Sequence, residues 1–207
     1  MVTIQCFKDE AERGVNILVG IVSADFKDGL AGGLFVDDWA ESRQVVDTLH
    51  VTLQEYVQDL KIWLVDDTYI KRILLGVLKV VANTYLETLL TFGLLVVGNV
   101  GERLTQDYQV ILQAFYACNQ WVHQDAVDRE TKPLRDTIEV LRMDLRRMAQ
   151  FVRTDFYLDF GSNYMKIWQT LMAMRDESRQ VHDAVYEAIM KGWVPATVSA
   201  FCDVPYV

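Results

Sequence analysis

The stretch LFVDDWAESRQVVDTLHVTLQEYVQDLKIWLVDDTYIKRILLGVLKVVANTYLETLL, residues 34–90, decides the fold. Apolar residues recur along it at spacings of three and four, which is the pattern of an amphipathic helix. The short acidic segment 65–68 divides the pattern in two, so the stretch predicts a hairpin of two helices. Phe35 and Trp39 precede the first helix and are expected to anchor the turn that leads into it.

The two stripes differ in width. The first comprises Val46, Leu49, Leu53, Tyr56 and Leu60. The second comprises Ile70, Ile73, Leu74, Val77, Leu78, Val81, Tyr85, Leu86 and Leu89. Because the second stripe covers more of the helix surface, the second helix is expected to lie deeper in a bundle.

Composition limits the classes of protein to consider. A chain of 207 residues that is 51% hydrophobic can bury a core without a metal or a disulfide. Three widely separated cysteines match no disulfide framework and indicate the cytoplasm. The net charge of -9 argues against nucleic acid and against broad adhesion to anionic lipid, so membrane contact is expected to be indirect or peripheral. The longest apolar runs are shorter than the roughly 20 residues that span a bilayer, which favours a soluble protein.

The N-terminal segment 1–33 is open to two interpretations. A helix over residues 15–30 would place Ile17, Ile21 and Ala24 on one side. A strand over residues 17–22 is the alternative, because a short run rich in Val and Ile has no decisive period. The helix is favoured, since no later segment offers a strand partner.

Helical spacing continues through the rest of the chain. Further helices are expected over residues 102–123, 134–152, 164–174 and 181–189. An acidic link over 124–130 is expected to precede a helix start at Thr131-Lys132-Pro133, and a break is expected over 155–162. The sequence therefore predicts an all-α fold, an elongated antiparallel bundle of about six to eight helices. Its expected parts are the N-terminal segment 1–33, the bundle 34–192 and a C-terminal tail 193–207.

Two acidic pairs, Asp37-Asp38 and Asp66-Asp67, could suggest a magnesium site. The Asp-Asp-x-x-Asp spacing that would put carboxylates on one helical face is absent, because no acid follows at the required place. Capping of helix N-termini explains both pairs, since acidic side chains accept hydrogen bonds from unpaired backbone N–H groups there.

The remaining ionisable and nucleophilic residues also favour structural roles. The three histidines, His50, His123 and His182, are far apart, and the acids near His123 indicate a solvated acidic loop and not a ligand set. Cys118 falls on an apolar stripe, where a thiol usually acts as a small buried hydrophobe. No catalytic, cofactor-binding or metal-ligating residue is predicted, and no cofactor.

One row of cations stands out in this acidic chain. At 100° per residue, Arg135, Arg142, Arg146 and Arg153 fall within roughly 20° of one line along a helix. The row could be a solvated face partly neutralised by Glu139. It could also be a docking strip for an acidic partner helix or for phosphate groups, and this second interpretation makes the four arginines candidate partner-binding residues.

Several segments resemble, in order and spacing, the C-terminal region of the exocyst complex component 3 family, the "Sec-six" subunit. They are LFVDDW (34–39), VVDT (45–48) leading to TLQEYVQD (52–59), VVANTYL (80–86), LMAMRDESR (171–179) and IMKG (189–192). Each segment is a packing pattern of low specificity, so the resemblance depends on their order. The family has a basic, polar segment where this chain has the apolar glycine-containing stretch 92–101, and the arginine row is not one of its motifs.

The resemblance implies an all-helical rod of a multisubunit tethering complex that holds secretory vesicles at the plasma membrane. It implies a non-catalytic subunit in the cytoplasm, peripheral at sites of exocytosis. The implied partners are other exocyst subunits, SNARE proteins and SNARE regulators. Two alternatives stay open: a helical adaptor unrelated to exocytosis, and a helical-bundle enzyme or small-ligand carrier, which the almost purely apolar stripes disfavour.

Overall fold

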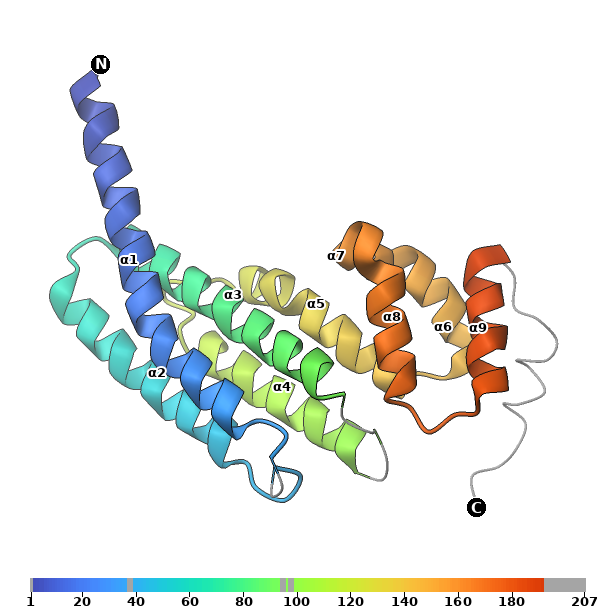
Figure 1. Cartoon of the computed structure of the whole chain (residues 1–207). Helices are drawn as coiled ribbons and strands as arrows, with labels where there is room; N and C mark the ends of the chain where they lie inside the picture. Colours follow the sequence, from blue (N-terminus) through green and yellow to red (C-terminus); the bar gives the residue numbers. More distant parts are fainter. Residues whose placement is uncertain (1, 37–38, 94–95, 97–98, 192–207) are drawn as a thin grey trace. The chain divides into compact units, whose positions relative to one another are not determined.

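The computed structural model describes residues 2–36, 39–93, 96 and 99–191 (Figure 1). It is an all-α helical bundle, which confirms the predicted fold class. Seven of the described helices have ten or more residues: α1 (Val2–Gly33), α2 (Gln44–Trp63), α3 (Asp67–Phe92), α4 (Val100–Tyr116), α5 (Gln124–Arg142), α8 (Tyr164–Ala173) and α9 (Arg179–Lys191). Shorter pieces link α5 to α8: α6 (Leu145–Phe151), a π-helical turn (Val152–Phe156), α7 (Tyr157–Phe160) and a 3₁₀ turn (Gly161–Asn163).

The chain divides into two compact units, which are described separately. Unit 1 contains residues 1–88 and 106–131, and unit 2 contains residues 89–105 and 132–207. The segment boundaries predicted at residues 33 and 192 stay predictions, as does the elongated form. The predicted tail 193–207 lies outside the described residues.

The helical hairpin of α2 and α3 in unit 1 is confirmed. Helix α2 ends at Trp63 and α3 begins at Asp67, at the predicted acidic break. The backbone N–H of Thr68 donates to Asp66 Oδ1 at 2.8 Å, so the predicted capping role is confirmed for Asp66. The Asp67 carboxylate instead accepts from Trp121 Nε1 at 2.7 Å. All nine residues of the second apolar stripe are buried, as expected for the deeper helix. The pair Asp37-Asp38 lies outside the described residues.

Helix α1 corrects two expectations about the N-terminal segment. It runs unbroken through residues 17–22, so the strand alternative is wrong. The predicted apolar side is also wrong, because Ile17 and Ile21 are more than half exposed. The buried side is instead formed by Val15, Val22, Phe26 and Leu30. Both sets have helical spacing, and packing against the neighbouring helices decides between them.

A glycine on α3 sets how closely α1 packs. A Cβ atom built on Gly76 would lie 2.6 Å from Val19 Cγ2, so the missing side chain allows the two helices to approach. Nearby, Arg72 Nη2 on α3 pairs with Glu12 Oε1 on α1 at 3.0 Å. In Figure 1 the first turns of α1, where residues 4–10 are exposed, extend beyond α2 and α3.

The turn between α1 and α2 is held by aromatic contacts, which confirms the predicted anchors. The Phe35 ring lies edge-on to Trp39, with centroids 4.8 Å apart, and edge-on to Tyr85 of α3 at 5.7 Å. Trp39 Nε1 and Tyr85 Oη each donate to Asp107 Oδ2 of α4 at 2.9 Å. The fully buried Asp107 therefore joins the turn to two helices.

Two helix boundaries in the middle of the chain differ from the prediction. Helix α4 ends at Tyr116, so the predicted helix 102–123 is too long. The expected acidic link 124–130 is the beginning of α5, and Pro133 lies inside that helix instead of in its first turn. Val127 and Thr131 are fully buried, so the buried side of α5 begins before the proline. This packing offsets the backbone hydrogen bond that proline cannot make.

A third difference is the break in the predicted helix 134–152. Helix α5 ends at Arg142, and α6 begins at Leu145 with Asp144 as its N-cap. Arg175 caps the C-terminal end of α5, because its Nη1 donates to the carbonyls of Val140 and Met143 at 2.7 and 2.9 Å. The predicted break at 155–162 is instead largely helical, with Gly161 in the left-handed region at φ +52°.

Helix α3 has the length and composition of a membrane-spanning segment. Its most apolar 18-residue window has a mean hydropathy of 1.5. Of that window, 56% is buried inside the protein, which is the behaviour of a core helix. Among the described helices it alone passes this test.

Candidate functional site

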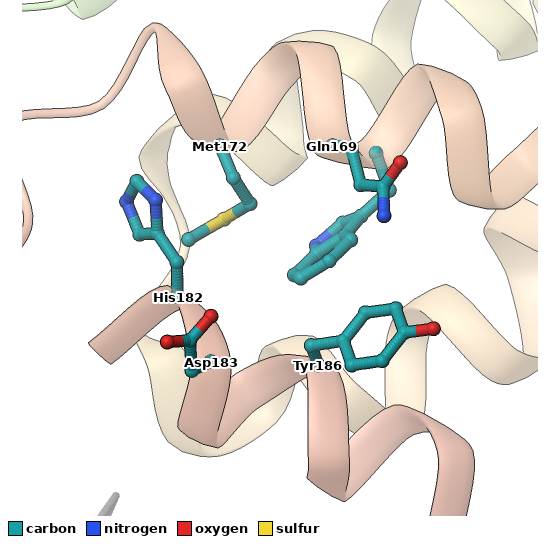
Figure 2. A pocket seen from close by; sticks show the side chains of 6 residues that line it. Gln169, Met172, His182, Asp183 and Tyr186 are labelled. Atoms are coloured by element: carbon teal, nitrogen blue, oxygen red, sulfur yellow. The ribbon is translucent and has the colours of Figure 1, made fainter. Parts of the chain in front are cut away.

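A groove between α8 and α9 in unit 2 is a candidate for a binding site (Figure 2). Its volume is about 250 Å³. Each helix supplies three residues at positions i, i+1 and i+4, a spacing that places them on one side of a helix. The six lining residues are Trp168, Gln169, Met172, His182, Asp183 and Tyr186.

The apolar part of the groove is fixed by packing. Trp168 and Met172 are almost fully buried, and Trp168 Nε1 donates to Met148 Sδ of α6 at 3.5 Å. The Tyr186 ring faces Trp168 from α9, with centroids 6.2 Å apart and an interplanar angle of 32°. Tyr186 is partly exposed, so its ring forms part of the accessible wall.

The polar part of the groove comes mainly from α9. His182 Nε2 is buried and has no hydrogen-bond partner in the structure. The Asp183 side chain is exposed and, among the described residues, makes neither a hydrogen bond nor an ion pair. Figure 2 shows both side chains near Met172, with the Tyr186 ring further along the same helix. The groove thus offers aromatic faces, one carboxylate and a buried ring nitrogen.

The four arginines do not lie on one continuous helix. Because Asp144 ends the predicted helix, Arg135 and Arg142 lie on α5, Arg146 on α6 and Arg153 in the π-helical turn. The geometric premise of the strip is therefore wrong. The physical reason is that the Asp144 carboxylate accepts from the backbone N–H of Arg146 at 2.7 Å and starts a new helix.

The side chains of Arg135 and Arg142 donate hydrogen bonds within unit 2. Arg135 Nε donates to Asp136 Oδ1 at 2.8 Å, and Arg142 Nη1 donates to Thr105 Oγ1 at 2.6 Å. The Arg142 stem also packs over Gly101, where an added Cβ would lie 3.2 Å from Arg142 Cγ. All four side chains are exposed, and their partner-binding role stays a prediction.

Sequence reasoning missed a buried charge cluster in unit 2. Lys132 Nζ bonds Asp136 Oδ2 at 2.7 Å and both carboxylate oxygens of Asp159 at 2.7 and 2.8 Å. Burial raises the pKa of Asp159, and Lys132 opposes this effect. Burial lowers the pKa of Lys132, but the hydrogen bonds that Lys132 donates to the two carboxylates outweigh it and the net shift is upward. The i, i+4 spacing of Lys132 and Asp136 was a visible signal, whereas Asp159 is 27 residues away from Lys132.

The other candidates have structural or solvated positions. His123 and Asp125 are both highly exposed, and their side chains lie 3.6 Å apart, at the beginning of α5. Cys118 is buried, as predicted, but lies in the turn after α4, and burial raises the pKa of its thiol. Within the described ranges, no group of three or more His, Cys, Asp or Glu side chains is placed to hold a metal ion.

Fold and groove together define an all-α helical-bundle protein with a side-chain-sized groove between two of its helices. No protein-family model, curated protein or solved structure matches this chain.

Proposed function

We propose that this protein is a non-catalytic helical scaffold in a vesicle-tethering complex of the exocyst type. It would act in the cytoplasm, peripherally at plasma-membrane sites of exocytosis, by presenting helical surfaces to other exocyst subunits and to SNARE proteins and their regulators. The order of the sequence segments described above supports the exocyst assignment. An all-α bundle is the architecture that this resemblance implies.

The observation that carries the scaffold role is an apolar patch at the end of α2. We define the α2 patch as Ile62, Trp63 and Val65, of which Ile62 is 77% exposed, Trp63 58% and Val65 fully exposed. Large apolar side chains grouped this closely on a surface are typical of protein–protein contacts. Tryptophan is, in addition, one of the residues that most often dominate the binding energy of an interface.

Helix α1 provides a second exposed apolar surface. Its members are Ile4, Phe7, Ile17 and Ile21. Unlike Val22 and Phe26 on the same helix, these side chains face solvent in the described structure. Two separate apolar surfaces suit a subunit that contacts more than one partner.

The test is co-purification of the full-length tagged protein from cells, followed by identification of bound exocyst subunits. Replacing Ile62 and Trp63 together by serine should reduce the recovery of at least one exocyst subunit by about tenfold or more, because a truncated hot spot costs about 2 kcal/mol. Leu158→Ser is the matched control, since Leu158 is as exposed as Ile62 but lies in unit 2. Absence of every exocyst subunit from the unmodified sample would overturn the proposal.

The arginines are tested in the same experiment. Arg146 and Arg153 are exposed and are exchanged together for glutamate, while Arg142 is left in place because it packs on Gly101. If the arginines bind an acidic partner, the double variant should recover less of a SNARE protein or exocyst subunit and keep its helical circular dichroism. Unchanged recovery of every partner removes the arginines from the binding surface.

A further inference from the structure

We propose that the groove between α8 and α9 binds an arginine side chain of a partner protein. The groove of about 250 Å³ holds the volume of roughly eight water molecules at about 30 Å³ each. Small-molecule sites usually measure about 300–1,000 Å³. The volume therefore suits one long side chain better than a complete metabolite.

The charge of the lining residues favours a cationic ligand. Asp183 contributes a carboxylate, and no lysine or arginine is among the lining residues. Arg179 lies one helical turn before Asp183, but the two side chains form no ion pair. The carboxylate is thus available to a cation from outside, and the net charge of -9 favours the approach of a basic partner.

The aromatic residues of the groove favour a planar cation. Tyr186 presents a ring face to solvent, and the buried Trp168 ring lies against it, with centroids 6.2 Å apart and an interplanar angle of 32°. A guanidinium group stacks on such faces through both its charge and its flat shape. A lysine ammonium is compact and strongly hydrated, so it gains less from the same walls.

The buried Nε2 of His182 lacks a hydrogen-bond partner among the described residues. A buried polar atom without a hydrogen bond is destabilising. A guanidinium carries five N–H donors, enough to reach both the Asp183 carboxylate and Nε2 when the imidazole proton is on Nδ1. An apolar side chain in the same place would cover the Asp183 carboxylate and leave Nε2 unsatisfied.

The experiment uses the full chain with labelled methionine methyl groups, and the Met172 signal is assigned by its loss in Met172→Leu. The probe is arginine with its α-amine acetylated and its carboxyl amidated. The equivalent derivatives of citrulline, which has a neutral urea of the same shape, and of leucine are the comparison probes. The arginine probe should shift the Met172 signal to saturation, and the two neutral probes should not.

Three variants separate the contributions of the groove. Asp183→Asn should weaken binding of the arginine probe about tenfold, since a charge-assisted hydrogen bond is lost. Tyr186→Phe keeps the ring and should bind nearly as well as the unmodified protein. Asp176→Asn removes an equal charge from an exposed residue outside the groove and should leave the affinity unchanged.

Three results would overturn the inference: no saturable shift with the arginine probe, an equal response to citrulline, or an unchanged affinity in Asp183→Asn. The inference does not depend on the proposed tethering function, because the probe is a small molecule and no exocyst subunit takes part. A negative result for arginine binding would therefore not bear on the tethering function, and the reverse also holds.

Discussion

The close approach of α1 to α3 gives a sharp prediction for Gly76→Ala. The added Cβ would lie 2.6 Å from Val19 Cγ2 and 3.0 Å from Cγ1. Carbon atoms in favourable contact are about 3.5–4.0 Å apart, so both methyl groups would overlap the new atom. Valine in a helix has essentially one χ1 rotamer and cannot turn away. Helix α1 must therefore move and loosen the packing of its buried side.

The expected magnitude follows from two opposing effects. Overpacking of a well-filled contact costs about 1–3 kcal/mol, while replacing glycine by alanine inside a helix stabilises it by about 1 kcal/mol. Gly20→Ala is the matched control, because a Cβ on Gly20 of α1 meets no atom within 4 Å. Gly76→Ala should thus be less stable than Gly20→Ala by about 1–3 kcal/mol, or melt at least about 2 °C lower.

Urea unfolding followed by far-UV circular dichroism measures the free energies of unfolding. Adding Val19→Ala to Gly76→Ala removes the overlapping methyl groups, so the two substitutions should be non-additive by about 1 kcal/mol or more in the stabilising direction. Equal stability of Gly76→Ala and Gly20→Ala would refute the packing argument. Additive effects of Val19→Ala and Gly76→Ala would refute it independently.

Two further predictions concern ionisable groups. Burial and a hydrogen bond to Asp128 raise the pKa of Tyr116 to about 12. The stability linked to this shift is complete below about pH 10 and is lost as the pH rises through 12, and Asp128→Asn should move the tyrosinate absorbance step of Tyr116 to lower pH. In unit 2, Lys132→Met leaves the buried carboxylate of Asp159 without its cation and Asp136 with Arg135 alone, which should cost about 3 kcal/mol in urea unfolding at neutral pH. Since burial raises the pKa of Asp159, this loss should shrink as the pH falls and the carboxyl protonates, and a loss independent of pH would contradict the assignment.

Much of the helical structure was readable from local sequence signals. The stripe of α3 and the acidic cap at Asp66 were predicted correctly, because periodicity and capping depend on residues within one or two turns of each other. The prediction of helix boundaries was wrong where two local signals conflict, a proline and a buried helix side that continues past it. Pro133 was interpreted as a helix start, yet the packing of Val127 and Thr131 carries α5 through it.

The candidate site was harder to predict from the sequence than the fold was. Trp168 and Tyr186 each fit an ordinary apolar stripe, and nothing in the sequence indicates that α8 and α9 leave a groove between them. The arginine row was computed for one straight helix. The N-cap at Asp144 divides that helix, although an aspartate within the stripe was a signal that could have been used.

The sequence by itself determined that this chain forms helices, where most of them lie, and that their apolar sides must be buried. Only the tertiary structure decided which side of α1 is buried, because Val22 and Ile21 both belong to apolar sets with helical spacing and the choice depends on neighbours far along the chain. It also decided that Lys132 meets Asp159 and that His182 Nε2 has no partner. Such contacts join residues on different helices, and their distances are set by packing and not by spacing in the chain.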